Sequence, residues 1–337
     1  MFKKLFLNKR INIIDGDNRL GASSGELKIK LKNMLDNGMY IRGIQIFHYS
    51  SIHYNTRWES YPLRFLNALL NSAATIQDEG NNLCLSDKEE SELQGDSSEV
   101  LGIGLSNIFM CKWYGVNINK VEKIGGAKKR CDYRFGYENQ VIIFEAKGRK
   151  NSKDIKSALN DCIKKKANYR ANFMYSTICH LPRNGDPVRL LLFDPPVNDK
   201  AIDYNENYVI ANHYKRVTEK AGLTVLSSSI EKRIKKFEKS GIWENTPLKS
   251  NVLKIGYLIS IGNNEFWTRR SSDSDRKSND INIQYGIDKK VIDLLEKWDL
   301  SELSKLFYDE LVIEENDKAF SILSDGSLLY IGNEAIE

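Results

Sequence analysis

The sequence has few of the residues that crosslink or stiffen a chain. It contains 6 prolines in 337 residues and no long tract of proline, glycine and serine, which argues against an extended linker or a disordered tail. Its 5 cysteines are widely spaced, and none forms a Cys-x-x-Cys pair. This spacing argues against a disulfide framework and against a zinc ribbon, and it fits a protein of the reducing cytoplasm. The cysteines are Cys84, Cys111, Cys131, Cys162 and Cys179.

Long apolar runs are also missing. No apolar run approaches the roughly 20 residues that a helix needs to cross a bilayer. Residues 1–14 combine positive charge with apolar side chains, but Asn8, Lys9 and Arg10 interrupt them. We therefore predict no signal peptide and no membrane partner, and we expect a soluble, cytoplasmic protein.

Histidine is scarce, with 4 residues in the chain. His48, His53, His180 and His213 have no metal-ligand spacing, and we interpret them as structural or surface residues. Cys179 and His180 are adjacent, so they would face opposite ways in a strand. The sequence therefore does not support a Cys-His hydrolase.

Charge is distributed unevenly, although the formal net charge is only +5. Residues 112–183 contain 17 Lys/Arg against 6 Asp/Glu, whereas residues 78–99 contain eight acids and one lysine. A basic centre beside an acidic flank favours a surface that binds a polyanion, and the alternative is a solvated, lysine-rich surface. Lys128, Lys129 and Arg130 form a basic loop that either contacts nucleic acid or is simply solvated.

The central part of the chain alternates between helical and strand patterns. The order is helix, three strands, helix, two strands and helix, which predicts an α/β fold with a mixed central sheet. We expect helices at 97–114, 152–170 and 208–221, and strands at 116–124, 131–137, 140–147, 173–181, 188–193 and 222–226. The first helix would be capped by Ser97 or Ser98, with Glu99 in its first turn. Gly102 and Gly104 lie inside this helix, which predicts close packing against the sheet.

The flanks are predicted to be α+β extensions. We expect three parts: an N-terminal extension at 1–96, a core at 97–228 and a C-terminal region at 229–337, with the flanks supplying recognition, dimerisation or partner docking. In the N-terminal part the patterns predict helices at 25–35 and 56–77 and an acidic loop at 78–96. In the C-terminal part they predict a helix ending at Gly241, a strand at 252–261, a polar loop at 269–280, helices at 287–298 and 301–311, and a terminal hairpin turning at Asp325-Gly326.

One strand ends in charged residues that its apolar character does not explain. Val141 to Phe144 is consecutively apolar, as in a strand buried on both faces, and Glu145-Ala146-Lys147 follows. A carboxylate and an amine there are costly unless something binds them. Period-two alternation places Glu145 and Lys147 on one face. Pairing the neighbouring strand across Glu138-Asn139 brings Asp132 opposite the same end.

Two carboxylates and a backbone carbonyl make an all-oxygen site that suits Mg²⁺, with Mn²⁺ as a substitute. The predicted ligands are Asp132, Glu145 and the carbonyl of Ala146. Lys147 beside the ion can hold a phosphate or position and activate a water, while the ion offsets charge in the transition state. The alternative is a surface salt bridge between Glu145 and Lys147.

The spacing Asp132-x12-Glu145-Ala146-Lys147, behind a helix carrying Glu99, resembles the PD-(D/E)XK superfamily of restriction-endonuclease-like nucleases. The helix, three strands, helix, strand order is similar to the α-β-β-β-α-β core of that family, over about 97–181. Cys131 stands where the name motif has proline. The resemblance implies that Asp132 and Glu145 bind metal, that Lys147 is catalytic, and that Glu99 is an accessory acid reaching the metal directly or through water. For Glu99 the alternative is an ordinary first-turn acid.

The same resemblance implies that the basic helix after the motif contacts phosphates, through Lys165, Lys166 and Arg170. The function expected from it is a Mg²⁺-dependent DNA endonuclease in prokaryotic defence against phage or plasmids, or in restriction. The alternatives are a non-cleaving nucleic-acid-binding subunit of a larger defence complex and an RNA-directed nuclease of the same fold. Cutting two strands needs two active sites, so we also expect a homodimer or a partner protein.

Overall fold

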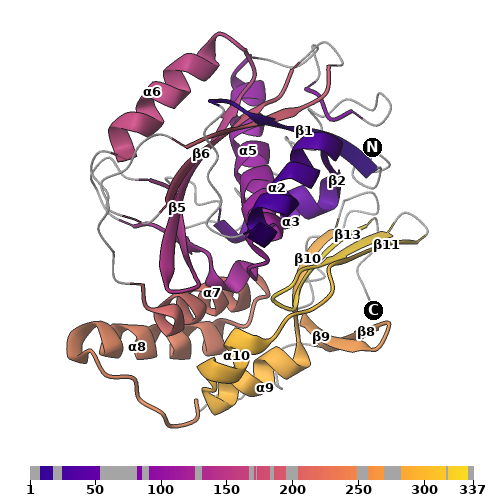
Figure 1. Cartoon of the computed structure of the whole chain (residues 1–337). Helices are drawn as coiled ribbons and strands as arrows, with labels where there is room; N and C mark the ends of the chain where they lie inside the picture. The colour runs from indigo at the N-terminus through magenta and orange to yellow at the C-terminus, as the bar shows by residue number, and fades with distance from the viewer. Residues whose placement is uncertain are drawn as a thin grey trace. The chain divides into compact units, whose positions relative to one another are not determined.

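The computed structural model describes residues 8–17, 25–53, 82–85, 91–125, 131–166, 171, 173–182, 186–194, 204–248, 257–268, 282–315 and 318–332. The chain forms two compact units, whose helices and strands Figure 1 labels. The first comprises residues 1–116 and 121–204, and the second 117–120 and 205–337. No helix in the described part of the chain has the length and apolar composition needed to cross a bilayer.

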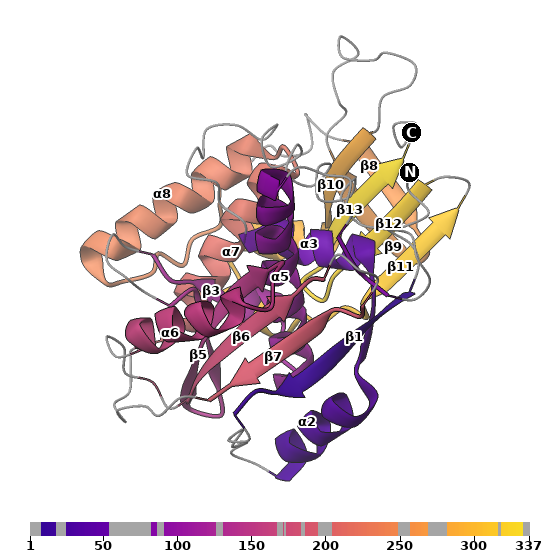
Figure 2. The ribbon, with the colours of Figure 1, turned by 90° about the horizontal axis from the view of Figure 1, so that it is seen from above.

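The first unit is built on a seven-stranded mixed sheet in the order β2-β1-β7-β6-β5-β4-β3. Figure 2 shows β5, β6, β7 and β1 side by side in it. The β5–β6 and β1–β7 pairs are parallel, and the others are antiparallel. This confirms the predicted α/β class and mixed sheet. The strands are β1 (Asn8–Asp15), β2 (Met39–Arg42), β3 (Glu122–Lys123), β4 (Tyr133–Tyr137), β5 (Gln140–Arg149), β6 (Phe173–His180) and β7 (Arg189–Phe193).

The β4–β5 hairpin forms as the sequence predicts. Glu138 and Asn139 connect the strands, and both have positive φ, 44° and 62°. Two such residues make the tight turn whose twist matches that of paired strands. The register sets Tyr133 opposite Phe144. Asp132, which precedes Tyr133, therefore lies beside Glu145, which follows Phe144.

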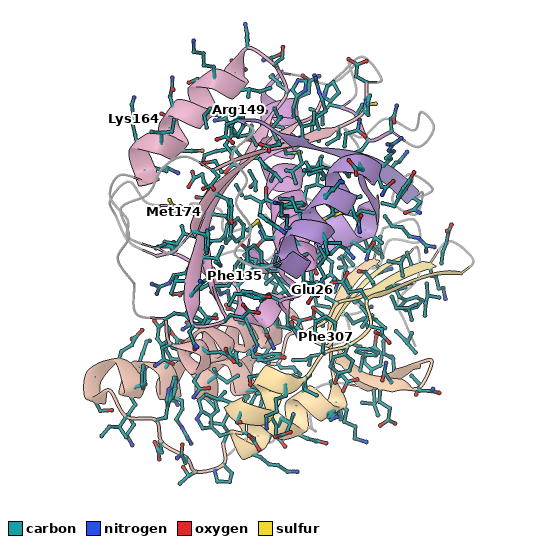
Figure 3. The ribbon with its side chains drawn as sticks, viewed as in Figure 1. Glu26, Phe135, Arg149, Lys164, Met174 and Phe307 are labelled. Carbon is teal, nitrogen blue, oxygen red and sulfur yellow. The ribbon has the colours of Figure 1, made fainter. Side chains whose placement is uncertain are left out.

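Helices α5 (Ser91–Tyr114) and α6 (Asp154–Lys166) cover opposite faces of the sheet around β5 and β6 (Figure 1). Phe135 packs with Phe144 and Tyr114 on the α5 face, whereas Met174 packs with Ile143 on the other (Figure 3). Because adjacent strand residues point to opposite faces, β5 is buried on both sides, as its apolar run predicts.

Glycines allow α5 to lie unusually close to its neighbours. A Cβ on Gly148 of β5 would lie 1.6 Å from the carbonyl oxygen of Ser98, and one on Gly102 would lie 2.7 Å from Gly148 Cα. The predicted packing of Gly102 on the sheet is therefore confirmed. Gly104 instead faces helix α3 (Gly43–His53), where a Cβ would lie 2.4 Å from the carbonyl oxygen of Ile46.

The N-terminal residues belong to the same sheet as the centre of the chain. β1 pairs in parallel with β7, and β2 follows β1. The predicted helix at 25–35 is present as α2 (Gly25–Asn37), and the one predicted at 56–77 lies outside the described residues. The expected boundaries at 96/97 and 228/229 thus do not coincide with the division between the units at 204/205.

Three predicted elements of the central region are wrong. Helix α5 begins at Ser91, so Ser97 and Ser98 do not cap it and Glu99 is not in its first turn. Its early buried face is polar (Gln94, Ser97 and Ser98), which hides the helical period from an apolar pattern.

The other two errors lie at 116–124 and 222–226. Instead of one strand, residues 116–124 contain a 3₁₀ turn, η1 (Ile118–Lys120), and the two-residue β3, because the Asn117 side chain accepts the N–H of Asn119. The predicted strand at 222–226 is the start of helix α8 (Thr224–Ser240). Leu226 begins a buried stripe at four-residue spacing that continues through Ile230 and Ile234.

The second unit packs helices against a six-stranded antiparallel sheet in the order β11-β12-β13-β10-β9-β8. The turn at Gly326 (φ 80°) joins β12 to β13 and confirms the predicted hairpin, whereas the helix expected at 301–311 ends at Lys305. The polar loop predicted at 269–280 lies outside the described residues. The elements are η1, α7 (Glu206–Lys220), α8, β8 (Tyr257–Ile261), β9 (Asn264–Thr268), β10 (Asn282–Asp288), α9 (Lys289–Lys297), α10 (Leu300–Lys305), β11 (Leu311–Glu315), β12 (Lys318–Ile322) and β13 (Ser327–Gly332).

Candidate active site

Four charged side chains meet where β4 begins beside the middle of β5, and we call them the charged cluster: Asp132, Glu145, Lys147 and Lys165. The ammonium of Lys147 lies 2.6 Å from Glu145 Oε1 and 3.5 Å from Asp132 Oδ2. Asp132 Oδ2 also accepts a hydrogen bond of 3.1 Å from the N–H of Ala146. The expected proximity of Asp132 to Glu145 and Lys147 is therefore present, but β5 continues to Arg149, so these residues do not end the strand as the expected range 140–147 implies.

Glu145 is the most buried member of the charged cluster, with a side chain that is 0% exposed. Burial raises its pKa from 4.5 to about 7, and the negative charge of Asp132 adds to this effect, while Lys147 and Lys165 oppose it. A buried acid that titrates near neutrality beside specific charged partners is typical of functional sites.

Lys147 is held between the two carboxylates. Burial alone would lower its pKa, but Asp132 and Glu145 outweigh burial and raise it above its ordinary value. Lys147 is therefore an ammonium in this arrangement. It can donate to an anion or to a water, but it is poorly suited to accept a proton.

Lys165 lies nearer to the carboxylates than its expected role as a phosphate contact requires. Reaching from the last turn of α6, it donates to Glu145 Oε1, the oxygen that Lys147 also contacts, and its Nζ lies 3.9 Å from Asp132 Oδ1. The sequence could not reveal this contact, because it depends on how α6 packs back onto the sheet. Its basic neighbour Lys164, labelled in Figure 3, is exposed.

Cys162, one turn before Lys165 on α6, borders the charged cluster. Burial and then the charge of Glu145 raise the pKa of its thiol to about 11. A thiol with that pKa is almost entirely protonated at neutral pH, so Cys162 lacks the thiolate that nucleophilic catalysis requires. Its neighbour Ile163, which the helical pattern assigns to the buried face, is 44% exposed.

The backbone of Glu99 lies close in space to the backbone of β5 beside the charged cluster, but on the opposite face of the sheet. Its N–H would lie 2.9 Å from a Cβ on Gly148, one residue beyond Lys147. Its side chain is exposed, and the ion pairs of the cluster join only Asp132, Glu145, Lys147 and Lys165 among the described residues. The structure therefore brings three of the four expected catalytic residues together and leaves Glu99 apart from them.

The charged cluster contains oxygen atoms suited to one hard divalent cation. Glu145 Oε2 is buried and accepts no hydrogen bond from the described residues. The N–H of Ala146 points toward Asp132, so its carbonyl points to the same side of the strand. No three His, Cys, Asp or Glu side chains gather into a metal-binding group within the described ranges. The donors are thus two carboxylates and a carbonyl, and water would complete the coordination.

Other expected site residues cannot be placed. Lys128, Lys129, Arg130 and Arg170 lie outside the described residues, as does the side chain of Lys166. The comparisons add no further assignment: the chain matches no protein-family model, no curated protein and no solved structure.

Proposed function

We propose that the protein is a metal-dependent phosphodiesterase that hydrolyses nucleic acid, with DNA favoured over RNA. The observation that carries this proposal is the convergence of Asp132, Glu145 and Lys147 inside a buried strand, with a buried Glu145 oxygen that accepts no hydrogen bond from the described residues. Such a costly arrangement of charges persists in a protein core when a ligand uses it.

Each residue of this set has a distinct role in the proposal. Asp132, Glu145 and the carbonyl of Ala146 hold a divalent cation, for which Mg²⁺ and Mn²⁺ are the best candidates. Such an ion, when bound there, would supply Lewis-acid chemistry: it would lower the pKa of a water and offset negative charge on the phosphate. Lys147 donates to that water or to a phosphate oxygen, and so orients the nucleophile or stabilises developing charge.

The surroundings of the charged cluster support a polyanionic substrate. Lys153 and Lys156 are exposed on or beside α6, the helix that also supplies Lys165. The excess of 17 Lys/Arg over 6 Asp/Glu in residues 112–183 favours the sequence-independent attraction of a phosphate backbone. The resemblance to PD-(D/E)XK nucleases adds the preference for DNA and a role in prokaryotic defence or restriction.

The test is cleavage of plasmid, linear duplex, single-stranded DNA and RNA in Mg²⁺, Mn²⁺ or EDTA. We expect Lys147→Ala and Glu145→Ala to lose about 100-fold or more in rate, because each removes an electrostatic contact made in the transition state. Lys164→Ala, which changes an exposed lysine of α6, should keep near-wild-type activity. If Lys147→Ala cleaves as fast as the wild type, the proposal is wrong.

One observation favours a second candidate, a non-cleaving nucleic-acid-binding subunit. The two lysines balance the two carboxylates, so the charged cluster is electrically neutral without a metal. Tight binding with no turnover of any substrate, in Mg²⁺ and in Mn²⁺, would favour this candidate. Turnover of RNA but not of DNA would instead identify an RNA-directed enzyme.

A further inference from the structure

We propose that Lys165 is an internal cation that occupies the charged cluster until a divalent metal displaces it, and that the displaced ammonium then binds the substrate phosphate. This inference rests on the proposed function. To the phosphate contact expected of Lys165 it adds an exchange with the metal, which the charge pattern of α6 does not imply.

The first observation is that two ammonium groups share one carboxylate oxygen. Lys147 and Lys165 both contact Glu145 Oε1, although they come from different elements, β5 and α6. Glu145 Oε2, on the same carboxylate, accepts no hydrogen bond from any described residue. A buried carboxylate oxygen without a hydrogen bond is costly, and it leaves one oxygen available to another cation.

The second observation is the charge balance. Two carboxylates and two ammoniums sum to zero, and Glu145 is fully buried. A divalent cation bound to the same carboxylates would leave a net charge of about +2 in a partly desolvated site, which like-charge repulsion over a few ångströms makes unfavourable. Binding is therefore easiest if one ammonium leaves as the metal enters.

The contacts indicate which lysine leaves. Lys147 is only two residues from Glu145 on the same strand and contacts both carboxylates, at 2.6 Å and 3.5 Å. Lys165 reaches Asp132 only at 3.9 Å, and it comes from a different element, the last turn of α6. Rotation of its flexible four-carbon chain can bring the ammonium into solvent beside the metal without any backbone change. There it can contact the phosphate that the metal also contacts.

The first test measures metal binding without nucleic acid. Calorimetric titration with Mn²⁺ should show about tenfold or tighter binding to Lys165→Gln than to the wild type, because one nearby positive charge is gone. Lys164→Gln, one residue away and exposed, should bind Mn²⁺ like the wild type, and Lys165→Arg, which keeps the charge, should not show the increase. At saturating Mn²⁺, Lys165→Gln should cleave nucleic acid more slowly than the wild type, because the phosphate contact is lost.

A second test uses the unaltered protein, so it does not depend on a variant folding. Acetic anhydride modifies accessible amines, and mass spectrometry of the peptides reports each lysine separately. Adding Mg²⁺ should increase acetylation of Lys165 several-fold and leave Lys164 unchanged as an internal reference. A purely structural ion pair would leave Lys165 equally protected with and without Mg²⁺.

The outcomes separate this inference from the proposed function. Equal Mn²⁺ affinity of wild type and Lys165→Gln, together with wild-type cleavage, overturns the inference alone. Tighter Mn²⁺ binding to Lys165→Gln without cleavage by any form supports cation exchange and overturns the nuclease. No Mn²⁺ binding to either form overturns both.

Discussion

At the scale of single residues, Glu145 is the least expected feature of the molecule. A carboxylate that is 0% exposed loses the hydration that stabilises its charge, and its pKa of about 7 records that loss. Two lysines reduce the penalty without removing it. The energetic cost of this residue is what makes a functional role the better explanation than a stabilising salt bridge.

The raised pKa of Glu145 predicts a pH dependence of stability. Its folded-state pKa, about 7, exceeds its ordinary value of 4.5, so the folded protein binds the proton more tightly than the unfolded chain does. The contribution of protonated Glu145 to the free energy of unfolding is therefore fully present below pH 4.5, and it is lost as the pH rises to about 7. The loss is on the order of 1 to 3 kcal/mol.

Urea unfolding of the metal-free protein between pH 4.5 and pH 8 measures this slope. Glu145→Gln should flatten it, because the glutamine side chain does not titrate. Glu99→Gln, at an exposed position on the neighbouring helix, should leave the slope as it is in the wild type. A slope that is the same in Glu145→Gln and in the wild type would contradict the assignment.

At the scale of elements, the contact between α5 and β5 sets the position of Lys147. The carbonyl of Ser98 on α5 lies where a Cβ of Gly148 would be, and both partners are backbone atoms that cannot rotate aside. Gly148→Ala should therefore destabilise the first unit by about 3 kcal/mol or more. Thermal unfolding measures the loss of stability. Cleavage assayed below the unfolding transition measures whether the position of Lys147 has changed.

Helix α5 supplies a matched control for that substitution. A Cβ at Gly95 meets nothing within 4 Å, so Gly95→Ala should stabilise the helix by about 1 kcal/mol. Equal destabilisation by Gly95→Ala and Gly148→Ala would show that alanine is unfavourable even where no atom is near, and the close contact between α5 and β5 would then not be the cause.

The hairpin between β12 and β13 is held by a buried contact between Asp325 and His213 of α7. Asp325 is buried, its Oδ2 lies 2.6 Å from His213 Nε2, and its Oδ1 accepts from the hydroxyl of Ser327. Burial raises the pKa of Asp325, but His213 and the hydrogen bonds from Ser327 together outweigh burial, so the pKa lies below its ordinary value of 3.8. Its stabilisation is thus present above that pH and is lost as the pH falls.

Asp325→Ala should destabilise the second unit by about 1 to 3 kcal/mol, because it leaves a buried histidine nitrogen without its hydrogen-bond partner. Hydrogen exchange of the amides in α7 and β13 measures this effect locally. Asp309→Ala, which changes an exposed acid in the same unit, should leave their protection intact. Unchanged exchange in Asp325→Ala would show that the pair contributes little.

The elements also show what the sequence could and could not predict. The β4–β5 hairpin and the position of Asp132 followed from local signals, the turn pair Glu138-Asn139 and the strand period, and both were correct. The start of α5 was missed because its buried face is polar, and the start of α8 because Leu226 was assigned to a strand. The part of Lys165 in the charged cluster is a tertiary contact across 20 residues, which no local pattern encodes.

At the scale of the whole molecule, the basic residues of the first unit should set the salt dependence of nucleic-acid binding. Each phosphate neutralised by a lysine contributes about −0.9 to the slope of log K against log salt for duplex DNA. The double variant Lys153→Gln/Lys156→Gln should therefore make this negative slope shallower by about 1 to 2. Both lysines are exposed at the start of α6.

Fluorescence anisotropy at a series of salt concentrations, in EDTA to prevent cleavage, measures this change. Lys232→Gln with Lys239→Gln removes two exposed lysines of α8 and serves as the charge-matched control. If the α8 pair lowers the slope and the α6 pair does not, the nucleic acid binds elsewhere than beside the charged cluster.

The central claim is that Asp132, Glu145 and Lys147 form one catalytic unit. Its most direct test is single-turnover cleavage in Mg²⁺ by Asp132→Asn, Glu145→Gln, Lys147→Met and the triple variant. Residues that act as a unit are not additive, so the triple variant should lose about as much rate as the most affected single variant. Wild-type cleavage by any single variant, or no metal-dependent cleavage by the wild type, would contradict the account.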